Sequence, residues 1–173
     1  MRKYNHLSRR KKASTLTALD TFSLYDQQKA AVAFMAAHNG RAGLFGSMGS
    51  GKTRTSLAYL SQVAHRIAIV AEITYIYVWE RELRTCLPNA DVLVLAGSGS
   101  TAQQAAALIA WARACLQRKI DLSIIIVNYD SFWRGRLRKA ILKWKPDGII
   151  ADEVQRLQDR NTKRSKFAHE LTD

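Results

Sequence analysis

The chain has 173 residues and a formal net charge of +13, from 27 Lys and Arg against 14 Asp and Glu. This length allows one domain with a sizeable core, and 47% apolar residues argue against general disorder. No apolar stretch approaches the ~18 residues of a membrane span, so we expect no membrane partner. Two cysteines without a CxxC pair and four scattered histidines exclude a disulfide framework and a zinc-ligand pattern, which favours an intracellular setting. The basic balance favours a polyanionic partner such as nucleic acid.

The beginning of the chain is strongly basic. Six Lys and Arg residues stand among the first twelve positions, and no acidic residue precedes Asp20. Apolar periodicity is missing through Lys12, so we expect residues 1–20 to form a flexible arm outside the core. A phosphate-contacting arm, a targeting segment and a merely solvated tail are all compatible with this composition.

From about residue 24, short β-branched runs alternate with longer segments of helical periodicity. The runs predict strands at 43–45, 67–71, 92–95, 122–127 and 148–151. The longer segments predict helices at 25–38, 52–64, 75–86, 101–117, 130–143 and 162–171, with Thr101 as an N-cap. Such alternation is typical of right-handed crossovers in a mostly parallel sheet with helices on both faces. We therefore predict one α/β domain over residues 21–173.

A second basic cluster lies in the fifth predicted helix and its flanks. Its apolar members Trp133, Leu137, Ile141 and Trp144 recur at helical spacing, which predicts a buried stripe. The cations between them would then form the solvated face, and a nucleic-acid surface is the alternative use of the same residues.

A glycine-rich segment between a predicted strand and a predicted helix fits the pattern GxxxxGK[ST]. It consists of Gly46, Ser47, Met48, Gly49, Ser50, Gly51, Lys52 and Thr53. In this context glycines let backbone amides turn around a phosphate, and the helix adds unpaired N–H groups and its positive dipole end. Lys52 would reach the β- and γ-phosphates, and the Thr53 hydroxyl would bind Mg²⁺. The alternative is a simple Gly/Ser turn before a helix.

Two adjacent carboxylates, Asp152 and Glu153, follow the predicted strand 148–151. The carboxyl ends of parallel strands face the ligand crevice, so the acids and the phosphate loop should open onto one sheet edge. Asp152 is expected to bind Mg²⁺, and Glu153 to orient or deprotonate an attacking water. An Asp-Glu pair is also a common helix N-terminal signal, so the prediction depends on its combination with Lys52 and Thr53.

The segment Asp152–Asp159 resembles the DExH/DExQ box of superfamily-two helicase-type ATPases, the group that includes DEAD/DEAH-box proteins. Residues 48–53 resemble the MGxGKT loop of the Swi/Snf-like branch in particular. Further segments match that branch in its order and spacing: Leu24–Lys29, Trp79–Leu83, Ile126–Asp130 and Asn161–Lys166. The resemblance runs from about residue 24 to 173.

The resemblance implies the first RecA-like, P-loop NTPase lobe of a nucleic-acid-stimulated motor that uses ATP and Mg²⁺. It also implies that Gln28 contacts the nucleobase and that Gln155 couples the nucleotide state to a neighbouring lobe. Two positions depart from the family pattern. Glu72 stands where the family usually has proline, so its carboxylate should repel a nucleic-acid backbone, and Asn128 replaces a Thr or Ser.

By the same resemblance the lobe is incomplete, because the strand of the third motif and the whole second lobe would follow Asp173. That strand lies between the phosphate-loop strand and the acidic strand in the family, so we expect a compromised sheet. The second lobe, in the same or another chain, supplies an arginine finger worth ~10³ to 10⁵ in rate in related systems. We therefore expect the isolated chain to hydrolyse ATP weakly or not at all.

The favoured function is the ATP-binding lobe of a DNA-dependent, helicase-like translocase, with DNA preferred over RNA by resemblance alone. The first alternative is a nucleic-acid-binding module whose nucleotide fold does not hydrolyse ATP. A small P-loop kinase is a weaker alternative, because the adjacent acids belong to the water-activating type of P-loop protein. The expected location is cytoplasmic or nucleoid-associated, or nuclear in a eukaryote.

Overall fold

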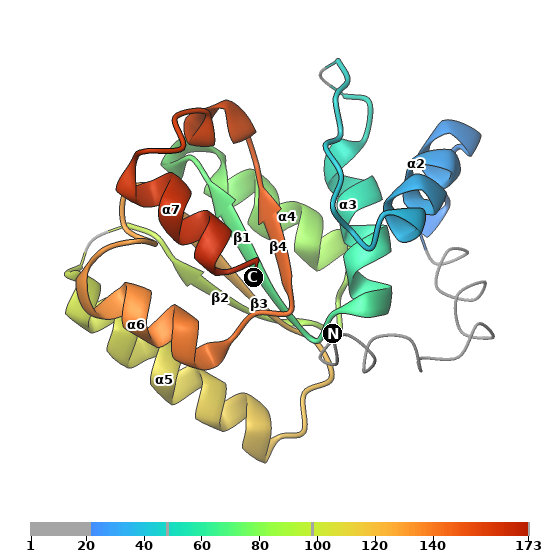
Figure 1. The fold of residues 1–173 in the computed structure, drawn as a ribbon. Helices are drawn as coiled ribbons and strands as arrows, with labels where there is room; N and C mark the ends of the chain where they lie inside the picture. Colours follow the sequence, from blue (N-terminus) through green and yellow to red (C-terminus); the bar gives the residue numbers. More distant parts are fainter. Residues whose placement is uncertain (1–21, 48, 98, 173) are drawn as a thin grey trace, which may run out of the picture. The chain divides into compact units, whose positions relative to one another are not determined.

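The computed structural model describes residues 22–47, 49–97 and 99–172, so the predicted arm at 1–20 and Met48 lie outside the described residues. The chain divides into two compact units, the first ending at Ala64 and the second beginning at His65. Figure 1 shows the helices and strands that make up the two units.

The first unit contains α2 (Asp26–Ala37) and α3 (Lys52–Val63), which pack together and match the first two predicted helices. Val32 and Met35 of α2 and Leu57 of α3 are buried. The chain before α2 is tied to α3 by the Arg54 guanidinium, whose Nε donates to the Phe22 carbonyl at 2.6 Å. The apolar faces predicted from the sequence therefore form a small helical core.

The predicted strand 43–45 is wrong. Residues 41–47 have no regular secondary structure, and the Phe45 side chain is 89% exposed. A strand needs a neighbouring strand to pair its backbone N–H and C=O groups, and none of the described strands pairs with this segment. The apolar run Gly43–Phe45 alone was not sufficient evidence for a strand.

The second unit is built on a four-stranded sheet in the order β2-β3-β1-β4, in which every neighbouring pair is parallel. The strands are β1 (Arg66–Ala71), β2 (Asp91–Leu95), β3 (Ser123–Asn128) and β4 (Gly148–Ala151). All four lie within a residue of the predicted bounds, and the α/β class with a parallel sheet is confirmed. Among the described strands β4 has a neighbour on one side only.

Helices cover both faces of this sheet, as predicted (Figure 1). They are α4 (Ile76–Cys86), α5 (Thr101–Gln117), α6 (Gly135–Trp144) and α7 (Lys163–Glu170), with short 3₁₀ turns η2 (Ile73–Tyr75) and η3 (Val154–Leu157). Five consecutive residues of β1 and five of β3 are buried, because α4 packs behind the sheet while α5 and α6 pack in front. Such continuous apolar strands are typical of parallel sheets.

The main core lies between the sheet and α5, α6 and α7. It includes Val127 of β3, Leu108 of α5, Leu137 and Ile141 of α6, and Phe167 of α7. Leu137, Ile141 and Trp144 are buried, as the predicted apolar stripe requires, whereas Trp133, its fourth predicted member, is only partly buried and precedes α6.

Two helix starts differ from the predictions. Ser100 rather than Thr101 is the N-cap of α5, because its hydroxyl accepts from the Gln103 N–H and the Gln103 side chain accepts from the Ser100 N–H. Helix α6 begins at Gly135 instead of 130. The preceding residues form turns in which the Asn128 side chain accepts from the Ser131 N–H at 2.8 Å.

We predict that Leu137→Ala lowers the free energy of unfolding by about 2 to 5 kcal/mol, because Leu137 is fully buried and the change leaves a cavity. Leu116→Ala is the control, since its side chain is 80% exposed and the change should stay within about 0.5 kcal/mol. Urea denaturation monitored by circular dichroism measures both. Equal losses in the two variants would contradict the core described above.

Candidate nucleotide site

The loop before α3 contains two glycines in the left-handed conformation, which favours glycine. Gly49 and Gly51 both adopt φ of 78°, and Gly51 is the left-handed N-cap from which α3 starts at Lys52. No side chain of the described residues caps this helix, which leaves its first N–H groups and positive dipole end without a side-chain partner from that part of the chain. Thr53 lies half-buried in the first turn. The predicted residues Gly46, Ser47 and Ser50 belong to the same loop.

The Lys52 side chain folds back over this loop. Its Nζ donates to the Gly46 carbonyl at 2.9 Å and to the Ser47 carbonyl at 3.0 Å. Both partners are neutral carbonyl oxygens. A phosphate oxygen would be a stronger partner for an ammonium group, because charge-assisted hydrogen bonds are roughly twice as strong as neutral ones.

Gln28 holds the loop from α2. The side chain is buried, its Nε2 donates to the Ser50 carbonyl at 3.3 Å, and its Oε1 accepts from the Tyr25 N–H at 3.0 Å. The resemblance predicted a nucleobase contact here, and the structure adds a tie to the phosphate loop. A Cβ at Gly51 would displace the Gln28 amide from its present position, and the positive φ of Gly51 separately favours glycine.

Asp152 lies at the carboxyl end of β4, where two aromatic residues hold it. The Trp79 Nε1–H of α4 donates to Asp152 Oδ2 at 2.8 Å, and the Tyr129 hydroxyl donates to the Asp152 carbonyl at 2.6 Å. The Asp152 N–H donates to Val70 of β1 at 2.9 Å. The sequence placed Trp79 in a family motif, but the contact across 73 positions had no signal in the sequence.

Tyr129 follows β3 and is buried beside this acid. Burial raises the pKa of Tyr129 well above its ordinary value, and the negative charges of Asp152, Glu153 and Glu72 raise it further. The hydroxyl therefore stays protonated at neutral pH and remains a hydrogen-bond donor to the Asp152 carbonyl.

Glu153 and Gln155 are exposed beyond β4. Glu153 adopts a left-handed φ of 54°, which is uncommon for a residue with a side chain, and its carboxylate accepts from the Gln155 Nε2. Left-handed residues outside glycine concentrate at functional sites. The structure thus joins these two predicted residues by a direct hydrogen bond.

The structure gives Glu72 a partner that the sequence reading missed. The Arg156 Nε donates to Glu72 Oε1 at 2.6 Å, across the carboxyl ends of β1 and β4. Hydrogen bonding to Glu72 and its charge raise the pKa of Arg156. The isolated carboxylate that was expected to repel a nucleic-acid backbone is therefore paired with a cation.

The described residues contain no group of three or more His, Cys, Asp and Glu side chains able to hold a metal ion. Mg²⁺ does not require such a group, because it keeps several waters and is usually bound by one or two carboxylates plus substrate phosphates. Asp152 fits this requirement: its Oδ2 is engaged by Trp79, and Oδ1 has no hydrogen bond or ion pair within the described part of the chain.

A glycine-rich loop before a helix in the first unit, and a parallel sheet followed by an Asp-Glu pair in the second, are both features found in P-loop nucleotide-binding α/β proteins. A family model described as the SNF2-related domain matches residues 27–173. The chain therefore belongs to the SNF2-related family of Swi/Snf helicase-type ATPases, and its fold is that of a RecA-like lobe. A comparison with curated proteins finds no match.

We predict that Gly51→Ala is more destabilising than Gly49→Ala. Both substitutions cost about 1 to 2 kcal/mol for placing a side chain at positive φ. Only the methyl group at 51 also displaces Gln28, since a Cβ at Gly49 meets no atom within 4 Å.

A double-mutant cycle separates the two effects. Gln28→Ala should recover part of the loss in Gly51→Ala, with a coupling energy of about 0.5 to 3 kcal/mol from thermal unfolding. Gln28→Ala should recover nothing in Gly49→Ala. Additive effects at positions 28 and 51 would refute the contact.

Proposed function

We propose that this chain is the first ATP-binding lobe of a DNA-dependent, Swi/Snf-like translocase. The observation that carries the proposal is the loop Gly46–Thr53, in which two left-handed glycines, Lys52 and an uncapped helix start occur together. The family match agrees with it. Because ATP and nucleic acid are its proposed ligands, the proposed location of the protein is inside the cell.

Five residues have proposed roles in this function. Lys52 exchanges its two carbonyl partners for the β- and γ-phosphates, and the N–H groups of the loop bind the remaining oxygens. Thr53 and Asp152 would hold Mg²⁺, which would neutralise charge on the phosphates. Glu153 orients or deprotonates the attacking water, and Gln28 contacts the nucleobase.

Hydrolysis by this chain alone should be slow. Transfer of the γ-phosphoryl group needs a cation placed at the developing charge, and an arginine finger in related systems contributes ~10³ to 10⁵ in rate. In the proposed function a second RecA-like lobe supplies that arginine, and Gln155 beside Glu153 transmits the nucleotide state to it. The present chain then serves mainly in binding.

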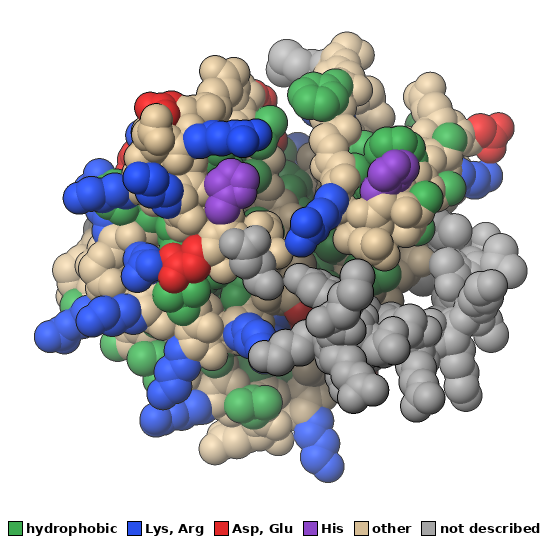
Figure 2. Space-filling model, viewed as in Figure 1, with side chains coloured by type: hydrophobic (Ala, Val, Ile, Leu, Met, Phe, Trp, Pro, Cys, Tyr) green, Lys and Arg blue, Asp and Glu red, His purple; other side chains and the backbone are tan. Residues whose placement is uncertain are grey.

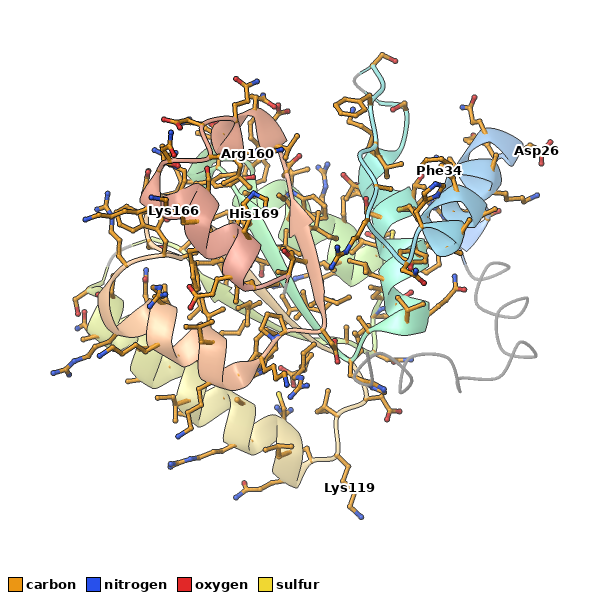
Figure 3. All side chains as sticks on the ribbon, viewed as in Figure 1. Asp26, Phe34, Lys119, Arg160, Lys166 and His169 are labelled. Carbon is orange, nitrogen blue, oxygen red and sulfur yellow. The ribbon has the colours of Figure 1, made fainter. Side chains whose placement is uncertain are left out.

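The second unit also offers a surface for a polyanion. Lys and Arg side chains gather over the face formed by α5, α6 and α7 (Figure 2). A groove of about 500 Å³ between α6 and α7 is lined by Arg134, Lys163 and Lys166, with Trp133 and Phe167 beside them. Figure 3 shows Lys166 projecting from α7.

This groove combines charge with aromatic rings. Arg134 lies 4.9 Å from the Trp133 ring centre, and Arg138 pairs with Glu170 while lying 5.2 Å from the Phe167 ring centre. Cations positioned by aromatic faces suit phosphate contacts, so we propose the groove as part of the DNA contact.

Among the described residues, every helix is too short or too polar to span a membrane.

We predict that ATP with Mg²⁺ raises the melting temperature of the wild-type chain and has no effect on Lys52→Ala, because ligands that bind only the folded state stabilise it. Differential scanning fluorimetry measures both. Lys29→Ala is the matched control, since Lys29 lies on the surface of α2 and pairs with Asp26. An equal shift in Lys52→Ala would contradict the proposed site.

The same preparation distinguishes the alternative of a non-hydrolysing nucleic-acid-binding module. If wild-type chain binds duplex DNA but shows no shift with ATP and Mg²⁺, the alternative is correct. Rapid DNA-stimulated hydrolysis by the isolated chain would instead contradict the requirement for a second lobe.

We predict that duplex DNA binding weakens steeply with salt, because neutralised phosphates release counterions. Lys163→Ala and Lys166→Ala should each reduce the slope of log K against log salt by about 1. Fluorescence anisotropy with labelled DNA gives these slopes. Lys29→Ala removes the same charge from a residue that does not line the groove and should leave the slope unchanged. A slope that changes equally in all three variants would argue against the groove.

A further inference from the structure

The carboxylate of Asp152, at the carboxyl edge of the sheet, accepts a hydrogen bond from a buried tryptophan. Trp79 is only 4% exposed, and its indole N–H points at one oxygen of the acid, 2.8 Å away. The bond joins the first turn of α4 to the residue that follows β4. Since α4 buries Ile76, Trp79 and Leu83, the indole is fixed by the helix packing itself.

The chemistry of indole makes this bond directional. A Trp N–H can donate and cannot accept, so its partner here must be an acceptor, the Asp152 Oδ2. The bond occupies Oδ2, restrains the side-chain torsions of Asp152 and leaves Oδ1 without a protein partner in the described residues. The Tyr129 hydroxyl fixes the backbone of the same residue through its carbonyl.

We propose that Trp79 is a positioning residue for metal binding by Asp152: its indole holds Oδ2, which leaves Oδ1 as the oxygen that would bind Mg²⁺. The inference rests on the proposed function and adds a residue that acts through Asp152 without touching nucleotide. Groups that orient a metal-binding carboxylate typically contribute 10- to 100-fold to metal affinity.

A purely structural bond is the competing explanation, and the chain offers a matched control for it. Trp111 Nε1 of α5 donates to Asp91 Oδ1 at 2.6 Å, also between a helix and a strand of the second unit. Asp91 lies at the start of β2 and pairs with Arg118. Trp111→Phe therefore removes the same type of bond from an acid that has no proposed metal role.

The test measures Mn²⁺ binding in the presence of ATP by electron paramagnetic resonance, for wild type, Trp79→Phe and Trp111→Phe. We expect the Mn²⁺ dissociation constant to rise about tenfold or more in Trp79→Phe and to stay unchanged in Trp111→Phe. Metal-free ATP binding should be equal in all three. An unchanged constant in Trp79→Phe, or equal rises in both variants, would overturn the proposal.

A second measurement covers the case in which Trp79→Phe does not fold. In wild-type chain carrying ¹⁵N-tryptophan, the Trp79 indole signal is assigned by eliminating those of Trp111, Trp133 and Trp144 with single Phe substitutions. Addition of Mg²⁺ to the ATP-bound chain should shift this signal and leave that of Trp111 in place. A Trp79 signal that ignores Mg²⁺ while metal binds overturns the inference, whereas absence of metal binding in wild type rejects the proposed function itself.

Discussion

The second unit depends on two central strands that are apolar at nearly every position. Val70 of β1 and Val127 of β3 face the α5–α6 side, and their neighbours along each strand face the opposite side. Both faces must therefore be covered, which requires helical crossovers and parallel strands. Parallel strands end at a common edge, and that edge is where Glu72, Tyr129 and Asp152 are found.

At this edge, a few polar contacts join the candidate functional residues to the packed helices and strands. Trp79 donates to the Asp152 carboxylate and Tyr129 donates to the Asp152 carbonyl, so both the side chain and the backbone of this residue are held. Glu72 and Arg156 add an ion pair between the ends of β1 and β4. In the first unit, Gln28 performs a comparable task for the phosphate loop. Asp152 and the glycine-rich loop thus each have a supporting partner from another element.

The sequence predicted what local patterns control. Helical periodicity placed α5 at 101–117, and apolar runs placed β1 and β3 within a residue. The prediction of a strand at 43–45 was wrong because a strand forms only where a neighbouring strand pairs with it, and a local sequence pattern does not show whether such a neighbour exists. Ser100 and Thr101 are both good N-caps, so the choice between them depends on packing. The Gln28–Ser50, Trp79–Asp152 and Glu72–Arg156 contacts join distant positions, and their spacing carries no periodic signal.

The central claim is that the loop Gly46–Thr53 binds the phosphates of ATP and that Asp152 serves the accompanying Mg²⁺. Amide hydrogen exchange of the whole chain, with ATP alone and with ATP and Mg²⁺, tests both parts in one experiment. The account predicts slower exchange across 46–53 with ATP, and slower exchange across 149–156 only when Mg²⁺ is added. Unchanged exchange across 46–53 at the highest soluble concentration of ATP would contradict the claim that this loop binds phosphate.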